Sequence, residues 1–563
     1  MSALALSRGP RTLRSPDEHL AAAAVWLLAG VFVLFLAAPL AAILVKAVQA
    51  PDGSFAGLAQ LTSLLAEARL RDAVSNSVLL ALATTAVVLP LALAFAFALT
   101  RSRLWGRPAW RLVALAPLLA PSLMPAISLV YLFGNQGLLK SWLGGTPIYG
   151  PLGIVMGEVF YTFPHALLVL ATALAVADAR LYEAAETLGA GKLRRFLTIT
   201  LPNARYGLVS AGMVVFTLVV TDFGVPKVIG GQINVLALEA YKQVIGQQNF
   251  GKGAVVGLLL LLPALLSFFV ERHLARRHGA SMSGRSVAYR ARRNRVRDVV
   301  LGIVCGATAL FLLALLGVAV AASLIKLWPY NLAPTLAHFD FDHVDGGGWG
   351  AFRNSLGVAT LTALGGTLLV FATAYLTLKT PAPRAPAALI RALVLLPMAV
   401  PGLVLGLGYI FFFNHPGNPL HALYGSLAIL VAATVIHFYT TAHLAMVTAL
   451  RQIDGEIEAV ARSLKRPWWT ACLRVTLPIS LPALLDVARY LFVSSMTTVS
   501  AVVFLYTPDT TLASIAVLSM DDAGDTAAAA AMATLIVASS LLATLLINAL
   551  AAWLGRRSQA WRA

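Results

Sequence analysis

The chain has 563 residues, of which 59% are hydrophobic and 12% charged, and its mean hydropathy is +0.81. In soluble globular chains about a quarter of the residues are charged, so this composition excludes an ordinary soluble enzyme or binding module and indicates an integral membrane protein. The formal net charge of +18 would suit a nucleic-acid partner, but no basic groove or aromatic platform accompanies it, so we expect no nucleic acid among the partners.

The first long apolar stretch, residues 21–45, contains no charge and exceeds the roughly 20 residues that span a bilayer core. It is long for the apolar part of a secretory signal, and further apolar stretches follow it, so we predict a retained span. Twelve spans are predicted, at 22–46, 77–100, 112–134, 152–175, 206–226, 253–270, 299–325, 355–378, 389–413, 426–449, 481–505 and 527–553. They are continuous apolar runs without the alternation of barrel strands, so the predicted fold class is an all-α integral membrane protein.

The basic residues predict the orientation of the chain. Most of the 42 Lys and Arg residues fall in segments on the same side as the N-terminus. The positive-inside rule therefore places both termini, residues 1–21 and 554–563, in the cytoplasm. Arg489 is an exception inside a span, where it is predicted to pair with Asp486 on the same helix.

The two halves of the chain repeat each other. The motif FYTFPH at 160–165 recurs as FYTTAH at 438–443, and Asn-Ser at 76–77 recurs at 354–355, both at an offset of 278. Further recurring pairs are Pro117 and Pro121 with Pro397 and Pro401, and TLP at 200–202 with 476–478. Each half has six spans in the same direction, which predicts two parallel repeats related by an axis along the membrane normal. A substrate path is expected near that axis.

The repeats predict the domain boundaries. The first half is expected at 22–270, with its core at about 71–270, and the second at 299–553, with its core at about 350–550. Between them, residues 271–298 contain nine arginines. We interpret this segment as a cytoplasmic linker held near anionic headgroups, with a regulatory site as the alternative.

A polar segment, EAAETLGAGKLRRFLTITLP at 183–202, interrupts the apolar chain. It predicts an interfacial helix–turn–helix with its turn at Gly189 and Gly191. Leu193, Phe196, Leu197 and Leu201 share one face, and the second half repeats that face with Trp469, Cys472, Leu473 and Leu477.

Several kinds of chemistry are not expected. The stretch GAGKL at 189–193 lacks the leading glycine and the trailing hydroxyl residue of a phosphate-binding loop, because Glu186 and Leu193 stand at those positions. The sequence shows no acid–base pair, nucleophile triad or metal-ligand spacing, so we expect neither an enzyme nor a cofactor bound by this chain. Cys305 and Cys472 are predicted to be small packing residues.

The polar segment resembles the coupling loop of type I ABC importer permeases, which has the form E-A-A, three residues, G, nine residues, I-x-L-P. The residues that match in the first half are Glu183, Ala184, Ala185, Gly189, Ile199, Leu201 and Pro202. The corresponding set in the second half is Glu458, Ala459, Ala461, Lys465, Leu477 and Pro478. There, Ala459 stands at the glutamate position and Lys465 at the glycine position, so the second copy departs from the pattern.

This resemblance, which covers both halves, implies the type I importer permease fold in a bacterial inner membrane. It implies two cytoplasmic ABC ATPase subunits as partners, which use ATP and receive one loop each, and a periplasmic solute-binding protein. Segments 220–250 and 494–525 resemble those of permeases for 2-aminoethylphosphonate, while ferric iron and thiamine are alternative solutes. A secondary transporter of the major facilitator type and a membrane scaffold or receptor without transport remain as alternatives.

Four residues are candidates for the substrate path. Asp222 and Lys227 could meet the ammonium and the phosphonate of such a solute, or Asp222 could cap a broken helix. His165 and His443 occupy equivalent positions and either line the path or pack between helices.

Two other groups of residues lie near the outer side or between helices. Asp521, Asp522 and Asp525 either contact the binding protein or belong to a solvated loop. Gly402 and Gly406 predict a close helix contact.

Overall fold

The computed structural model describes residues 16–49, 54–55, 57, 59–175, 178–278, 289, 291 and 294–558. Within these residues the regular secondary structure consists of helices and a small antiparallel pair of strands, β1 (Ile325–Leu327) and β2 (Asn331–Pro334). Nine helices of the described part are long and apolar enough to cross a membrane, or up to twelve if each bent helix pair is one span. The predicted all-α membrane class is confirmed.

The elements of the first half are α1 (Pro16–Phe32), η1 (Val33–Ala37), α2 (Ala38–Ala47), α3 (Ala59–Ala66), α4 (Ala68–Arg101), α5 (Arg107–Leu115), η2 (Ala116–Leu119), α6 (Leu123–Phe133), η3 (Lys140–Leu143), α7 (Pro151–Ala175), α8 (Ala179–Thr187), α9 (Lys192–Arg195), η4 (Phe196–Thr200), α10 (Leu201–Thr221), α11 (Gly224–Ile229), α12 (Leu236–Tyr241), η5 (Lys242–Gly246) and α13 (Phe250–His278). The helix α13 thus continues into the segment predicted as a linker.

The elements of the second half, besides the strands, are α14 (Arg295–Leu324), η6 (Ala337–Phe339), α15 (Gly348–Lys379), α16 (Arg384–Leu393), η7 (Leu396–Ala399), α17 (Gly402–Phe413), η8 (His421–Leu423), α18 (Leu427–His437), α19 (Tyr439–Arg451), α20 (Glu456–Ser463), α21 (Trp468–Ala471), η9 (Cys472–Thr476), α22 (Leu477–Thr497), η10 (Pro508–Thr510), α23 (Ala513–Ala523) and α24 (Thr526–Ser558). Of the predicted linker, the stretch between α13 and α14 lies largely outside the described residues.

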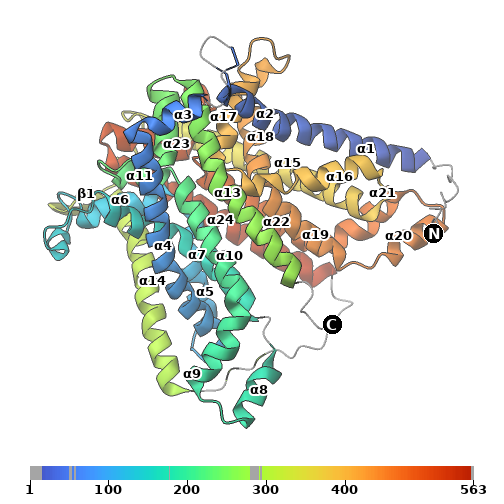
Figure 1. The fold of residues 1–563 in the computed structure, drawn as a ribbon, viewed down its shortest axis with the longest axis horizontal. Helices are drawn as coiled ribbons and strands as arrows, with labels where there is room; N and C mark the ends of the chain where they lie inside the picture. Colours follow the sequence, from blue (N-terminus) through green and yellow to red (C-terminus); the bar gives the residue numbers. More distant parts are fainter. Residues whose placement is uncertain are drawn as a thin grey trace.

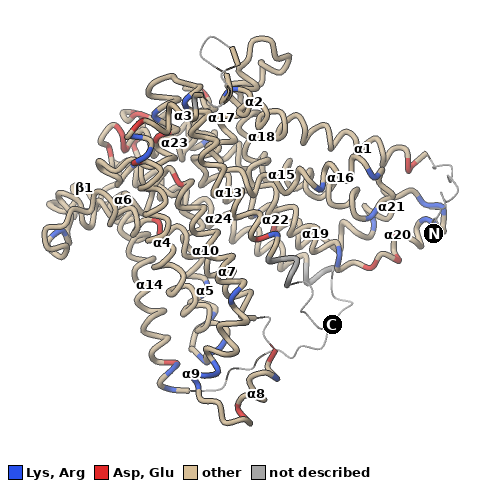
Figure 2. The backbone as a smooth tube through the Cα atoms, in the orientation of Figure 1, with Lys and Arg blue, Asp and Glu red and all other residues tan. Residues whose placement is uncertain are grey.

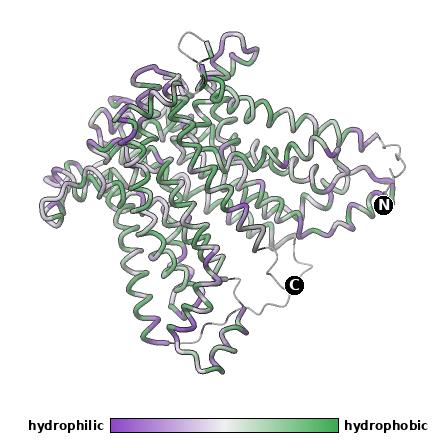
Figure 3. The backbone as a smooth tube through the Cα atoms, in the orientation of Figure 1, coloured by the Kyte–Doolittle hydropathy of each residue, from purple (hydrophilic) through white to green (hydrophobic). Residues whose placement is uncertain are grey.

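The long helices form two bundles that meet at one end and diverge toward the other. In Figure 1 the diverging ends carry α8–α9 in one bundle and α20–α21 in the other, while α11 and α23 lie where the bundles meet. Basic residues gather at the diverging ends (Figure 2). Hydrophobic residues line the long helices between the ends (Figure 3). The arrangement is that of a membrane protein whose diverging ends share one aqueous side.

Two predicted spans are sharply bent at the repeated prolines. The segment of α5–η2 makes an angle of 101° with α6, and α16–η7 makes 118° with α17. A proline removes a backbone donor and clashes with the preceding turn, which favours a break at these positions. The runs at 112–134 and 389–413 are continuous in hydropathy, but each contains two helical segments. The first segment is α5–η2 or α16–η7, and the second, here called the inner helix, is the largely buried α6 or α17.

The first helix of each half packs on the other half. The α1–α2 segment contacts α16 and α17, and α14 contacts α5 and α6. The Tyr409 hydroxyl donates to the Phe35 carbonyl at 2.7 Å, and the Ser128 hydroxyl donates to the Leu315 carbonyl at 2.6 Å. In both cases the buried inner helix binds a backbone carbonyl of the other half's first helix, so the two halves are interlocked.

The repeated Asn-Ser motif has the same structural role in both halves. The Ser77 hydroxyl accepts from the Leu236 amide at 2.8 Å, and the Ser355 hydroxyl accepts from the Ala513 amide at 2.7 Å. The neighbouring Asn76 and Asn354 side chains donate to backbone carbonyls just before α12 and α23. The motif therefore fixes the start of an equivalent short helix in each half.

Candidate coupling loops and translocation path

The two candidate coupling loops have the same secondary structure at an offset of 276, apart from one residue at the start of the first helix. The elements α8, α9, η4 and α10 end at positions that correspond to the ends of α20, α21, η9 and α22. The predicted helix–turn–helix is therefore present in both halves, although the second copy lacks the glutamate and the glycine of the motif.

The turn between the two short helices is a Schellman motif in both loops. Gly189 adopts a φ of +72°, and its equivalent Lys465 adopts a φ of +52°. In the first loop the Gly189 and Ala190 amides donate to Glu186 and Ala185, and in the second the Lys465 and Arg466 amides donate to Arg462 and Ala461. A left-handed residue at this place is the usual way to end a helix, and glycine is its usual occupant. Gly191, also predicted in the turn, has an ordinary φ of −64°.

The outer surface of each loop exposes large apolar side chains. Leu188 is 85% exposed and its equivalent Leu464 is 67% exposed, and Leu193 and Trp469 are exposed beside them. In the first loop, Glu183 and Ala184 lie exposed on α8. Phe196 instead faces α4, where its ring contacts that of Phe97. Each loop therefore presents exposed apolar side chains next to its charged residues.

Glu458 lies on the inner side of the second loop. Its side chain is 8% exposed and pairs with Lys379 at 3.4 Å. Counted by the offset of 276, it corresponds to Tyr182 rather than to Glu183, and Tyr182 is buried too. The sequence analysis included Glu458 in the second coupling loop, and the structure places its side chain against the bundle.

Asp222 caps a helix, as one of the two interpretations predicted. Its carboxylate accepts from the Val225 amide at 2.8 Å, at the start of α11. It lies beside Glu158 of α7, and both side chains are buried in the first bundle. These two carboxyl groups thus form a polar pair in an otherwise largely apolar interior.

Lys227 joins the two halves. Its ammonium lies 2.9 Å from the carboxylate of Asp522, which belongs to α23 of the second half. Beside this pair the ring of Tyr241 stacks on Phe504, with centroids 6.2 Å apart, and again one ring comes from each half. The aspartates at 521–525 have no basic neighbour in sequence, but Asp522 has one in space. Burial and the charge of Asp522 raise the pKa of Asp521 to about 6.

A second polar cluster lies close to this junction, around Glu239 of α12. Gln243, Asn234 and Arg69 all donate to its carboxylate, at 2.6, 2.6 and 3.0 Å. Burial alone would raise the pKa of Glu239, but these bonds and the charge of Arg69 outweigh it and lower the pKa below its ordinary value. The cluster therefore holds a buried charge in place at the closed ends of the bundles.

His165 and His443 each pack on the tyrosine four residues earlier in the same helix. The ring centroids of His165 and Tyr161 are 5.9 Å apart, and those of His443 and Tyr439 are 5.5 Å apart. This repeated pair accounts for the repeated FYTFPH and FYTTAH motifs and gives both histidines a packing role.

Two smaller predictions are confirmed. Arg489 pairs with Asp486 at 3.0 Å. Cys305 and Cys472 are buried and free. The predicted close helix contact at Gly402 and Gly406 is different in the structure. A methyl group on Gly406 would lie 3.3 Å from the Ala501 carbonyl, and Ala501 belongs to a turn that follows α22, so α17 packs there on a turn and not on a helix.

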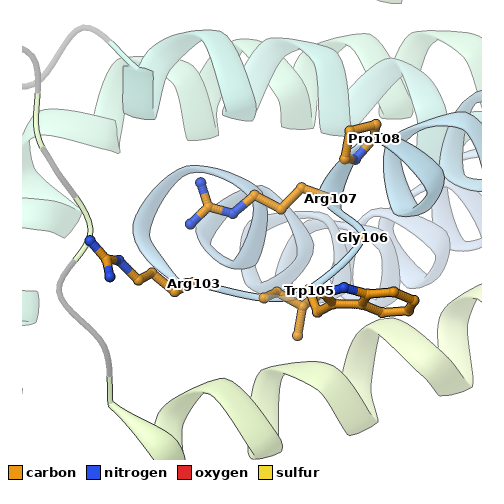
Figure 4. Close-up of a pocket in the computed structure, with 6 residues that line it drawn as sticks. Arg103, Trp105, Gly106, Arg107 and Pro108 are labelled. Carbon is orange, nitrogen blue, oxygen red and sulfur yellow. The ribbon is translucent and has the colours of Figure 1, made fainter.

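Among the described residues, no group of three or more His, Cys, Asp or Glu side chains could hold a metal ion. A cavity of about 620 Å³ lies at the turn between α4 and α5, where Arg103, Trp105 and Arg107 surround it (Figure 4). This cavity is at a diverging end of the first bundle, away from the Lys227–Asp522 pair.

Comparisons with known proteins cover both halves. The sequence pattern of a family described as the inner membrane component of binding-protein-dependent transport systems matches residues 89–280 and 382–559. A ferric transport system permease protein of Actinobacillus pleuropneumoniae is 26% identical over 510 residues, which cover 86% of this chain and 72% of the relative. A relative from Haemophilus influenzae, also named for ferric transport, is 28% identical over 433 residues, which cover 73% of this chain and 67% of the relative. A Salmonella choleraesuis protein named for 2-aminoethylphosphonate transport is 32% identical over 164 residues, 29% of this chain and 60% of the relative.

Proposed function

Because the chain belongs to the family of inner-membrane components of binding-protein-dependent transport systems and is the permease subunit of an ABC importer, we propose that its solute is ferric iron. This proposal rests on the fraction of the chain that each group of relatives matches. Relatives named for ferric transport match 73% and 86% of the chain, across both halves. The relative named for 2-aminoethylphosphonate matches 29% of it. Ferric iron, weighed above as an alternative, therefore replaces 2-aminoethylphosphonate as the main proposal.

The interior of the first bundle holds a pair of carboxyl groups that is compatible with a cation as the solute. Ferric iron is a hard cation that prefers carboxylate oxygen ligands, and Glu158 and Asp222 are neighbouring carboxyl groups in that interior. Two carboxylates are too few to hold the ion tightly, and a path must release what it admits. High affinity would then belong to the binding protein on the outer side.

The coupling loops give the proposed mechanism. Each loop docks its exposed apolar surface, with Leu188 or Leu464 at the tip, on one of two cytoplasmic ATPase subunits. When ATP draws the two ATPases together, the diverging bundle ends shown in Figure 1 approach each other. The opposite ends, closed by the Lys227–Asp522 pair, then separate and admit the solute from the binding protein. In this proposal both chain termini are cytoplasmic.

Uptake into proteoliposomes tests the proposal. The permease is reconstituted with its cognate ATPase and binding protein, and uptake of labelled ferric iron is measured with and without internal ATP. We expect ATP-dependent iron uptake that neither 2-aminoethylphosphonate nor thiamine inhibits, and no uptake in a Gly189→Asp variant that inserts normally.

The outcomes separate mechanism from solute. ATP-dependent uptake of labelled 2-aminoethylphosphonate or thiamine, without iron uptake, would retain the importer mechanism and overturn the iron assignment. Normal uptake in the Gly189→Asp variant would overturn the proposed role of the loops.

A further inference from the structure

Each coupling helix is attached to the last residue of the second long helix in its own half. That residue is Arg101 in α4 and Lys379 in α15, which are 278 positions apart, as are the repeated motifs of the two halves. Arg101 is 2% exposed, and the Lys379 side chain is 7% exposed. Basic residues at a cytoplasmic helix end are usually hydrated, so burial at both positions calls for a specific role.

In the second half the attachment is an ion pair. The Lys379 ammonium donates to the Ile453 carbonyl at 2.8 Å and lies 3.4 Å from the Glu458 carboxylate of α20. The other oxygen of Glu458 accepts from the Thr476 hydroxyl at 3.4 Å, at the end of η9. Lys379, Glu458 and Thr476, here called the second latch, thus connect both arms of the loop to α15.

In the first half the same positions use aromatic rings. The Arg101 guanidinium donates to the Leu174 carbonyl at 2.6 Å and lies 5.1 Å from the centroid of Tyr182 on α8. The Tyr182 hydroxyl bonds to the Thr200 hydroxyl at 3.0 Å, at the end of η4. Arg101, Tyr182 and Thr200 form the first latch, and each residue corresponds to its counterpart in the second.

The segment that joins the halves also takes part. The ring of Tyr289 lies 4.3 Å from the Arg101 guanidinium and 4.9 Å from the Tyr182 ring, so the cation contacts both rings. Two residues further, the Ala291 carbonyl accepts from Arg103 at 3.0 Å. Tyr289 therefore ties the inter-half junction to the first latch.

One helical turn before each basic residue, a second side chain contacts the loop. Phe97 packs on Phe196 of η4, and the Tyr375 hydroxyl donates to the Trp468 carbonyl at 3.2 Å. Residues four apart share a helix face, so each long helix grips its loop at two points. Two points of contact restrain rotation as well as translation.

We propose that Arg101 and Lys379 are positioning residues that make each coupling loop move as one body with its transmembrane bundle. A loop held only by its two chain connections could tilt when an ATPase pulls it, and the motion would be lost in the Gly189 or Lys465 turn. A buried charge resists separation from its partner, because water does not compensate it when the contact breaks. The latches therefore convert ATPase closure into bundle movement. This inference rests on the proposed docking of the loops on the ATPases.

The second latch is tested in the reconstituted complex by Glu458→Gln, Lys379→Met and the double variant. The measurements are ATPase copurification, the rate of ATP hydrolysis and the amount of solute transported per ATP. We expect the ATPase to copurify with every variant, and transported solute per ATP to fall by about fivefold or more, the lower range of coupling between distant sites. The double variant leaves no buried charge unpaired, so it should recover thermal stability but not the solute-to-ATP ratio.

Tyr289→Leu provides a test that leaves both loops unchanged. It keeps an apolar side chain but removes a ring from Arg101, and we expect a smaller fall in solute per ATP. An unchanged ratio in all four variants would overturn the inference, as would loss of ATPase copurification, which would assign the latches to the docking surface. A wild-type complex that fails to bind its ATPase would instead overturn the proposed function.

Discussion

Gly189 and Lys465 occupy the same position in the two coupling loops, yet they differ in what the left-handed backbone costs them. Glycine adopts this conformation freely, whereas a residue with a Cβ is destabilised there by about 1–2 kcal/mol. Nothing lies within 4 Å of the place where a Cβ on Gly189 would point, so the cost of a substitution is set by the backbone alone.

We therefore expect Gly189→Ala and Lys465→Gly to act in opposite directions. The first should weaken the turn by about 1 kcal/mol and reduce ATPase affinity by roughly fivefold, and the second should strengthen it by a similar amount. Titration of the detergent-solubilised permease with its ATPase measures both. Gly191→Ala is the matched control, since Gly191 has a φ of −64°, and an equal loss of affinity there would refute the backbone argument.

Asp522 provides a second prediction at this scale. Asp522→Asn should weaken the closed state at the outer end, because Lys227 loses the charge that holds the two halves together. A partly exposed pair contributes up to about 1 kcal/mol, so opening should become up to about fivefold more frequent. Basal ATP hydrolysis without binding protein is expected to rise accordingly. Asp525→Asn is the control, and an equal rise there would show that general charge loss is responsible.

The sequence predicted which residues form the coupling loops but not which way each one faces. The helix–turn–helix and the turn at Gly189 follow from local spacing, but the predicted apolar face is divided, because Leu193 and Leu197 are exposed while Phe196 packs on α4. Local spacing could not pair Glu458 with Lys379, which is 79 positions away, or Lys227, a candidate for the substrate path, with Asp522 of the other half. The signal that could have found the latches was present, since adding 278 to Arg101 gives Lys379.

At the scale of elements, hydropathy identified the long apolar runs but not their shapes. A buried run of apolar residues has the same hydropathy whether it is straight or bent, so the angles of 101° and 118° could not be read from it. The repeated prolines were visible at these places. A proline can either kink a membrane helix or end it. At these positions it ends the helix, because α6 and α17 pack against the first helix of the other half.

These inner helices carry a prediction. Tyr409→Phe removes the bond to the Phe35 carbonyl, and Ser128→Ala removes the bond to the Leu315 carbonyl. Each should reduce stability by about 0.5–1.5 kcal/mol, the range for one such bond. Thermal unfolding in detergent, followed by size-exclusion chromatography, provides the comparison. If only one variant is destabilised, the two contacts are not equivalent and the interlocking is one-sided.

At the scale of the whole molecule, the interlocked first helices make the covalent linker dispensable for assembly. Co-expressed fragments 1–284 and 285–563 should associate, because α1–α2 packs on α16 and α17 while α14 packs on α5 and α6. Copurification through a tag on one fragment tests this. A fragment 59–284, which lacks α1–α2, should associate much less well, and full association of that shortened fragment would contradict the prediction.

The same interlocking sets an order of events during synthesis. The segment α1–α2 is the first part of the described chain to leave the ribosome, but the helix that binds its Phe35 carbonyl is made 374 residues later. Until then lipid must cover the surface of α1–α2 that α17 will occupy, although α2 can already pack on α13 of its own half. This early part of the nascent chain is thus among the last to reach all of its final neighbours. A premature stop in the second half therefore leaves the first half incomplete as well.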